Sequence, residues 1–170
     1  ALDPNERGFS QRMFFDGVDD KVTLDSEIVI STEAFFEAHA EIPIGSDRNC
    51  MAGKTSSGGD IILTASQATF RNDGDSAANW DISGLTGVHQ FRFETGSGNS
   101  VSLFIDGVSQ GAEFIVAGAL TISAIGKGRF TTSLGFGIIS DVNINDQASY
   151  RGYGIDDWQD QIGSNNGTVT

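Results

Sequence analysis

The chain has 170 residues, which is enough for one domain with a sizeable apolar core. Its 23 acidic residues against 10 Lys and Arg give a formal net charge of -13, and such a field repels phosphate backbones and anionic lipid surfaces. Nucleic-acid binding and membrane-surface binding are therefore not expected, while the charge itself fits either cation binding or simple solubility.

The first predicted element is a β-hairpin in Met13–Leu24, MFFDGVDDKVTL. Two adjacent phenylalanines have high strand propensity, and Val22 and Leu24 alternate with polar residues. Between them, Asp16-Gly17 and Asp19-Asp20 supply turn chemistry. A linker rich in Asp and Ser is expected to follow the hairpin.

The next segment, Ala34–Ile42 (AFFEAHAEI), alternates with a period of two. Alanine and glutamate also favour a helix, but the strict alternation and Pro43 favour a strand. One face of this strand would be apolar and the other would carry polar groups beside one aromatic ring. The residues of that second face are Phe35, Glu37, His39 and Glu41.

The rest of the chain is typical of short strands separated by glycine-rich turns. The expected strands are 49–54, 61–64, 68–72, 88–94, 101–105, 114–116, 120–125 and 136–144. The segment around Trp80 is expected to be a loop, and Asp106-Gly107 is a favoured pair for a tight turn. About eleven to thirteen strands and no predicted helix indicate an all-β, two-sheet antiparallel sandwich.

Residues 1–149 are expected to form this domain, and residues 150–170 differ in character, with acidic residues around Trp158. They would either add an edge strand or begin a following module.

Several kinds of site are excluded by residue counts. Cys50 is the only cysteine, so an internal disulfide and a zinc site built on cysteines are impossible, and its neighbour Met51 favours a buried apolar role. The two histidines cannot form a three-histidine zinc site, and His89 is expected to be a partly buried structural residue. No P-loop, dinucleotide fingerprint or nucleophile elbow occurs, and no apolar run is long enough to span a membrane.

Four segments in order resemble the concanavalin A-like jelly roll of laminin-G-type domains: FDGVDDKVTL, FFEAHAEIP, SLFIDGVSQG and IISDVNI. Lys21 stands where this family often has an aromatic residue, and Ser140 and Asn143 depart from its late strand. The resemblance covers roughly residues 10–146 and implies a jelly-roll sandwich. Similar modules occur in phage tail fibres and spikes, bacterial surface proteins and polysaccharide-degrading enzymes, so the fold does not determine the function.

The resemblance places Ala34–Ile42 in the concave sheet of such a sandwich. Neighbours among Glu37, His39 and Glu41 would lie ~7 Å apart, which suits an acid–base pair on a glycosidic bond, a divalent-ion site or an ordinary solvated strand face. The glycosidase patterns E-x-D-x-x-E and E-x-D-x-E and the alginate-lyase signatures of this fold are absent. We therefore do not expect an enzyme.

Carbohydrate binding suits the same surface better, because aromatic rings stack on sugars while carboxylates, amides and arginine bond hydroxyl groups. Trp80 has the alternative of packing beneath a loop, and Arg92 that of a cross-strand ion pair with Glu37 or Glu41. The candidate residues are Phe35, Glu37, His39, Glu41, Trp80, Gln90 and Arg92.

A structural calcium ion is the expected cofactor, because calcium takes carboxylate and carbonyl oxygens. The resemblance points first to Asp141, beside a site on the convex face, and the motif N-D-G-D adds Asp73 and Asp75. Asp16 is expected to cap its turn rather than to bind metal.

The sequence thus predicts a non-enzymatic carbohydrate-binding module of a phage tail fibre, spike or virion decoration protein, or of a bacterial surface protein. Its location would be the virion, the extracellular space or a cell surface. Its partners would be an extracellular or cell-surface polysaccharide and other virion or surface-protein subunits, and resemblance to fibre modules implies a homo-oligomer. Neither nucleic acid nor membrane insertion is expected. A purely structural virion module is the second interpretation, and a polysaccharide-active enzyme is the third.

Overall fold

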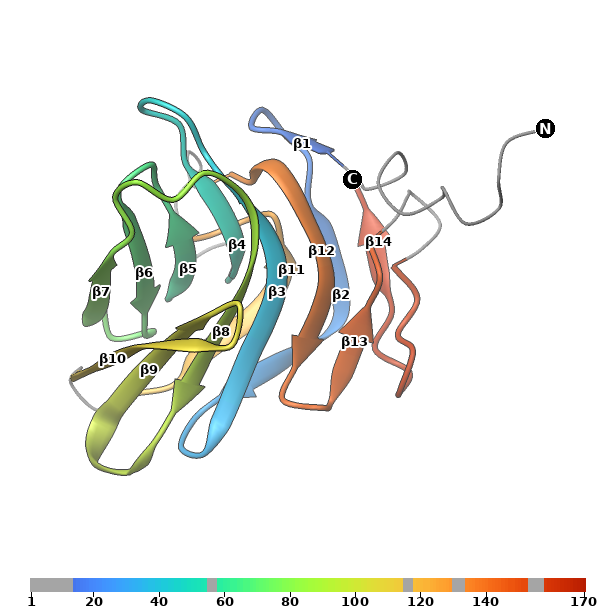
Figure 1. Ribbon diagram of the computed structural model, residues 1–170. Helices are drawn as coiled ribbons and strands as arrows, with labels where there is room; N and C mark the ends of the chain where they lie inside the picture. Colours follow the sequence, from blue (N-terminus) through green and yellow to red (C-terminus); the bar gives the residue numbers. More distant parts are fainter. Residues whose placement is uncertain (1–13, 55–57, 115–117, 130–133, 153–157) are drawn as a thin grey trace.

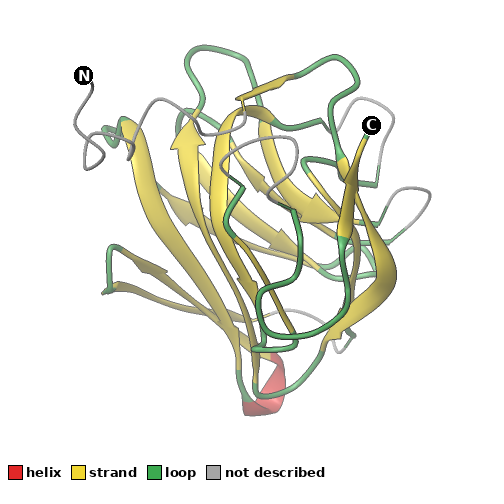
Figure 2. Ribbon diagram, turned by 90° about the vertical axis from the view of Figure 1, so that its right-hand side faces the viewer, coloured by secondary structure: helices red, strands yellow, loops and turns green. Residues whose placement is uncertain are grey.

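The computed structural model describes residues 14–54, 58–114, 118–129, 134–152 and 158–170. Two antiparallel sheets lie face to face (Figure 1), and the only helical element in these ranges is a 3-10 turn at Ser97–Asn99 (Figure 2). Among the described residues, no helix is long and apolar enough to cross a membrane. The predicted all-β, two-sheet sandwich is confirmed.

Sheet 1 has the strand order β1-β12-β3-β8-β9-β10, and β13 also pairs with β12. Its strands are β1 (Phe14–Asp16), β3 (Ala34–Ile42), β8 (Gly87–Thr95), β9 (Ser100–Ile105), β10 (Val108–Phe114), β12 (Phe136–Ile144) and β13 (Ala148–Tyr150).

Sheet 2 has the order β14-β2-β11-β4-β5-β6-β7. The chain passes repeatedly between the two sheets, which is the jelly-roll arrangement. The strands of sheet 2 are β2 (Val22–Ile30), β4 (Asn49–Gly53), β5 (Asp60–Leu63), β6 (Gln67–Arg71), β7 (Ala77–Asp81), β11 (Leu120–Ile125) and β14 (Gly167–Val169).

The strand β3 follows the predicted alternation along its whole length. Phe36, Ala38 and Ala40 are completely buried and point toward sheet 2, while the residues between them are partly exposed. On β8, Phe91 and Phe93 are likewise completely buried. Burying an aromatic side chain of this size stabilises the fold by about 1.5–3 kcal/mol, so these two central strands anchor sheet 1 on the core.

The predicted opening hairpin is wrong. β1 pairs with β12 in sheet 1, with Phe15 opposite Gly137, whereas β2 pairs with β11 and β14 in sheet 2. The acidic turn therefore carries the chain from one sheet to the other. Phe15 lies in sheet 1 and Val22 in sheet 2, and both side chains are completely buried in the core between the sheets. The strand partners therefore follow from the burial of these side chains, which turn residues alone do not predict.

Three other boundaries differ from expectation. β2 continues through the expected linker to Ile30, because Ile28 and Ile30 are buried. Trp80 lies in strand β7 rather than in a loop, and residues 108–113 form most of β10. The predicted tight turn is confirmed, because Asp106 (φ 50°) and Gly107 (φ 78°) join β9 to β10 with positive φ at both positions.

The described part of the tail belongs to the same core. β13 extends sheet 1 and β14 is an edge strand of sheet 2. Between them Trp158 is completely buried, with its ring centroid 6.2 Å from that of Phe15 and 6.0 Å from that of Tyr150. The carboxylate of Asp160 accepts hydrogen bonds from the backbone N–H groups of the surrounding loop and so holds its shape.

Candidate functional site on the outer face of sheet 1

The partly exposed side chains of β3 and β8 form one continuous surface. The strand register sets Phe35 opposite Glu94 and His39 opposite Gln90, so that both rows point away from the core. We call this surface the β3–β8 face. It consists of Phe35, Glu37, His39, Glu41, Gln90, Arg92 and Glu94, with Asp141 of β12 beside it.

Arg92 is held at the centre of this face. Its Nε donates to Oε1 of Glu94 at 2.6 Å and its terminal nitrogen donates to Oε2 of Glu37 at 3.2 Å. Its Cζ lies 3.8 Å from the ring centroid of Phe35, a cation–π contact. Partial burial disfavours the charge, but the hydrogen bonds to Glu94 and Glu37 outweigh that effect and raise the pKa of Arg92. The expected cross-strand ion pair is confirmed.

His39 lies next to an aspartate that comes from the neighbouring strand. Its Nδ1 is 3.0 Å from Oδ2 of Asp141. The two groups attract electrostatically at this distance, but the ring N–H is not aligned with the oxygen, so Nδ1 makes no hydrogen bond. About a third of the His39 side chain is exposed.

A β-bulge in β12 creates this contact. Ser140 is opposite His39 and Asn143 is opposite Glu37, so β12 carries one extra residue between these two pairs. Asp141 in the bulge has φ 50°, a left-handed conformation that is unfavourable for a residue other than glycine. The bulge brings Asp141 to the β3–β8 face, which corrects the expectation that it lies on the convex side.

The carboxylate of Glu41 is also held in place, by a backbone N–H group of β12. Its Oε2 accepts a hydrogen bond from the N–H of Ile138 at 3.1 Å. Gly137 has φ 94°, which disfavours a residue with a side chain, and a Cβ atom there would also lie 2.8 Å from the same oxygen. Glu37 and Glu41 are therefore both engaged within the protein.

The chain's second histidine lies in a different setting. Nδ1 of His89 is 2.6 Å from Oδ2 of Asp106, and its Nε2 is 3.1 Å from the carbonyl oxygen of Thr86. Its hydrogen bond to Asp106 holds the pKa of that carboxyl below its usual range. Both ring nitrogens are used internally, so the predicted structural role of His89 is confirmed.

Trp80 does not lie on the β3–β8 face. It belongs to β7 of sheet 2 and is only 5% exposed, with its ring centroid 5.7 Å from that of Phe93 inside the sandwich. Its Nε1 donates to the carbonyl oxygen of Gly111 at 3.3 Å. The ring is therefore committed to the core and has no free face on which a sugar could stack, which corrects the expectation from sequence.

The other two calcium candidates also have partners within the protein. The carboxylate of Asp73 accepts hydrogen bonds from the N–H of Gly59 at 2.8 Å and from Oγ1 of Thr121 at 2.6 Å, and the N–H of Thr121 adds another at 3.2 Å. Asp75 pairs with Arg129 and lies 3.7 Å from Nε of Arg71. The hydrogen bond from Arg129 lowers the pKa of Asp75. These contacts give both residues structural roles.

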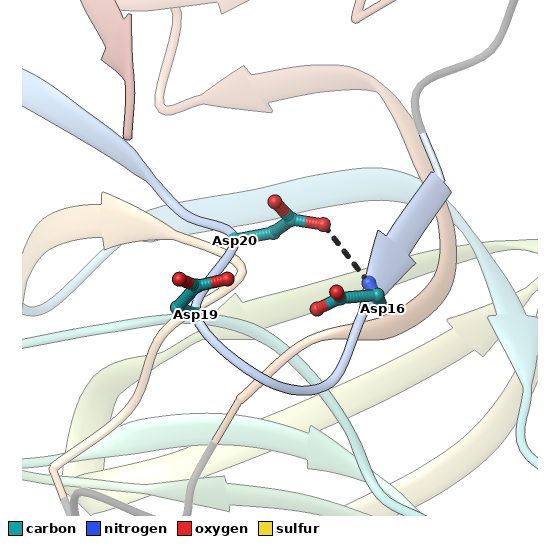
Figure 3. A group of neighbouring side chains, drawn as sticks. All are labelled: Asp16, Asp19 and Asp20. Atoms are coloured by element: carbon teal, nitrogen blue, oxygen red, sulfur yellow. Dashed lines mark hydrogen bonds between the residues drawn. The ribbon is translucent and has the colours of Figure 1, made fainter.

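A separate acidic group lies in the turn that follows β1 (Figure 3). Oδ1 of Asp16 accepts the N–H of Val18 at 2.7 Å, which is the expected turn cap. Oδ2 of Asp20 accepts the N–H of Asp16 at 3.0 Å, the dashed line in Figure 3. With Asp19, these residues place three carboxylate oxygens within 4.8 Å of one another. Sequence reasoning assigned this turn only to the fold. Exposed acidic groups often lack an ion, so calcium binding stays a prediction.

Comparisons with known proteins add little. A scan of protein-family models finds no match to the chain, and a search among curated proteins finds no significant match either. Among solved structures, the chain is similar to a heptameric SAP-like pentraxin from Limulus polyphemus, with a TM-score of 0.42, 12% identity and 76% of each chain covered. It is also similar to the galectin LEC-6 from Caenorhabditis elegans, with a TM-score of 0.31, 12% identity, and 78% of this chain and 98% of the galectin covered. The description of the fold therefore rests on the strand order of the two sheets.

Proposed function

We propose that the protein is a non-enzymatic carbohydrate-binding module whose ligand lies across β3 and β8 on the outer face of sheet 1. The observation that carries the proposal is the β3–β8 face itself. It is a row of fixed but partly exposed polar side chains set around one arginine and one aromatic ring. Sugar-binding surfaces combine these groups, since hydroxyls need acceptors and donors at fixed positions while the apolar side of a sugar ring needs an aromatic or planar partner.

Fixed geometry favours binding because less conformational entropy is lost when the ligand arrives. Arg92 is locked by two carboxylates and a ring, and Glu41 by a backbone amide. Both nonetheless lie at the surface, with about a third of the Arg92 side chain exposed.

The same contacts favour binding over catalysis. Glycoside hydrolysis needs one carboxylic acid that donates a proton and one carboxylate that acts as a base or nucleophile. An oxygen of Glu37 already accepts a hydrogen bond from Arg92, and an oxygen of Glu41 accepts one from the backbone N–H of Ile138. Neither is placed as a proton donor.

A glycan array with the wild-type protein and two variants tests the proposal. We expect reproducible binding to one sugar family, loss of this binding in Arg92→Ala, and wild-type binding in Arg48→Ala, which removes an exposed arginine outside the face. Binding that survives equally in both variants would move the ligand away from the β3–β8 face. Silence of the wild-type protein across the array would favour the purely structural module.

We place the module in a phage tail fibre, spike or virion decoration protein, or in a bacterial surface protein, at the virion or cell surface. The support is the resemblance of its ordered motifs to laminin-G-type domains of such proteins, together with the acidic charge of -13, which suits a protein that is not attracted to nucleic acid. Its partners would be an extracellular or cell-surface polysaccharide and further subunits of the same assembly. Sedimentation of the purified chain would show whether it forms the expected homo-oligomer.

A further inference from the structure

We propose that His39 presents a fixed hydrogen-bond acceptor on the β3–β8 face, and that this face therefore selects neutral, hydroxyl-rich saccharides over anionic ones. The inference rests on the proposed function, and it adds the ligand class and the residue that sets it.

The position of Asp141 determines where the proton sits on His39. Nδ1 is buried and its nearest acidic group is the Asp141 carboxylate at 3.0 Å. An unprotonated Nδ1 would direct its lone pair toward a negative charge, whereas a protonated Nδ1 is attracted to it. The neutral ring thus carries its proton on Nδ1, which leaves the lone pair on Nε2.

The second nitrogen of His39 is open to a ligand. Within the described part of the chain, the contact of His39 is made through Nδ1, so Nε2 has no hydrogen-bond partner, and Nε2 is not among the buried polar atoms that lack one. Since Nδ1 is buried while about a third of the side chain is exposed, the exposed edge of the ring is the edge that carries Nε2. The face therefore offers a lone pair at a fixed position, ready to accept a hydrogen bond from a hydroxyl group.

The bulge holds Asp141 in an unfavourable backbone conformation, with φ 50°. A non-glycine residue with positive φ is unfavourable and persists only where its surroundings support it. Here the N–H of Asp141 donates to the carbonyl oxygen of Arg151 at 2.8 Å, and Oγ of Ser140 donates to its Oδ2 at 3.2 Å. Two independent contacts therefore keep the carboxylate beside His39.

The charges around His39 determine what the face rejects. On its own strand it has Glu37 and Glu41 as neighbours, on β8 it has the uncharged Gln90, and on β12 it has Asp141. Asp106 in the β9–β10 turn is close enough for the charge of His39 to affect its pKa, and it is bound by His89. The one described cation of the face, Arg92, is offset by Glu37 and Glu94. A uronate or sulfate would thus enter a negative field, whereas neutral hydroxyls would find acceptors.

The first part of the test needs no ligand. In uniformly 15N-labelled protein near pH 8, imidazole nitrogen shifts report the tautomer of each histidine, and the chain has only two. We expect His39 to be protonated on Nδ1, and Asp141→Ala to give a mixture of both tautomers while the His89 signals stay unchanged. His39 protonated on Nε2 in the wild-type protein, or an unchanged tautomer in Asp141→Ala, would overturn the inference without affecting the proposed function.

The second part measures affinity by calorimetry for oligosaccharides of equal length, neutral (cellohexaose, mannohexaose, galactohexaose) and anionic (oligogalacturonate, oligoalginate). We expect binding of a neutral member only, about five- to tenfold weaker in Asp141→Ala. The variant His39→Gln should bind the neutral member weakly. Preference for the anionic members would overturn the inference but keep the proposed function, and silence toward every member would overturn both.

Discussion

Two polar regions of this sandwich contain similar residues in different circumstances. Around Asp73 in sheet 2, both carboxylate oxygens are used by backbone and hydroxyl donors of the protein itself. On the β3–β8 face of sheet 1, Arg92 and His39 are held by neighbours but remain about one third exposed, and Nε2 of His39 is left unused. The difference shows that residue type alone does not mark a site. A site is marked instead by a polar atom that the fold holds in place and that makes no hydrogen bond within the protein.

The largest expected effect is the loss of stability when the structural carboxylate of Asp73 is removed. Asp73→Ala removes the acceptor of three donors that join the β4–β5 connection to β11, and it leaves the N–H groups of Gly59 and Thr121 without a partner. We expect the free energy of unfolding to fall by about 3 kcal/mol, since each charge-assisted hydrogen bond contributes about 1.5–3 kcal/mol and such contributions add incompletely. Urea denaturation measures the free energy of unfolding of the variant and of the wild-type protein.

Glu27→Ala is the control for this variant. It removes an exposed ion pair with Lys54 at 3.2 Å, and we expect a change below about 1 kcal/mol. Equal effects of the two substitutions would mean that Asp73 is as dispensable as a surface charge, and the contrast between the two regions would then fail.

Asp160 gives a second structural carboxylate whose contribution depends on pH. Partial burial works against its charge, but backbone hydrogen bonds from residues that include Ser149, Ile162 and Asn165 prevail and lower its pKa. A group with a lowered folded-state pKa stabilises the fold above its ordinary pKa of about 3.9, and this stabilisation is lost as the pH falls through the folded value. We expect Asp160→Asn to cost about 1–2 kcal/mol near neutral pH and progressively less in acid.

Thermal unfolding of both proteins between about pH 7 and about pH 2.5 gives this difference directly, because asparagine has the same shape but does not titrate. A stability difference between the two proteins that grows toward low pH would contradict the lowered pKa of Asp160.

Arg92 on the β3–β8 face is expected to matter more for ligand binding than for stability. Arg92→Ala removes ion pairs with Glu37 and Glu94 that are partly exposed, and we expect a loss of stability of only about 1 kcal/mol or less. We expect its effect on binding of the array-selected glycan to be at least tenfold by calorimetry. A variant that unfolds as readily as Asp73→Ala yet binds normally would reverse the roles assigned to the two regions.

The sequence predicted the structure well where it depends on the alternation of apolar and polar residues along one strand. The period of two in Ala34–Ile42 placed four side chains on one face of β3, and the opposed position of Arg92 anticipated its ion pair with Glu37. It was uninformative where the outcome depends on distant partners. Nothing near Trp80 indicates that its ring meets Phe93 of the other sheet, and nothing near Asp141 indicates that a bulge turns it toward His39.

The opening turn differs from the Asp75 region in that its acidic side chains have no ion-pair partner in the described part of the chain. The three aspartates of Figure 3 are close together, whereas Asp75 is occupied by Arg129 and Arg71. If calcium binds this protein, we expect it at the turn and weakly, since solvent-facing sites with few protein ligands fall in the millimolar range. For a dissociation constant of about 1 mM, calcium at about 10 mM would add about 1.4 kcal/mol and raise the melting temperature by about 3–5 °C. Asp19→Asn should abolish this shift and Asp75→Asn should keep it, and a melting temperature that neither calcium nor chelator changes would leave the turn with its structural role alone.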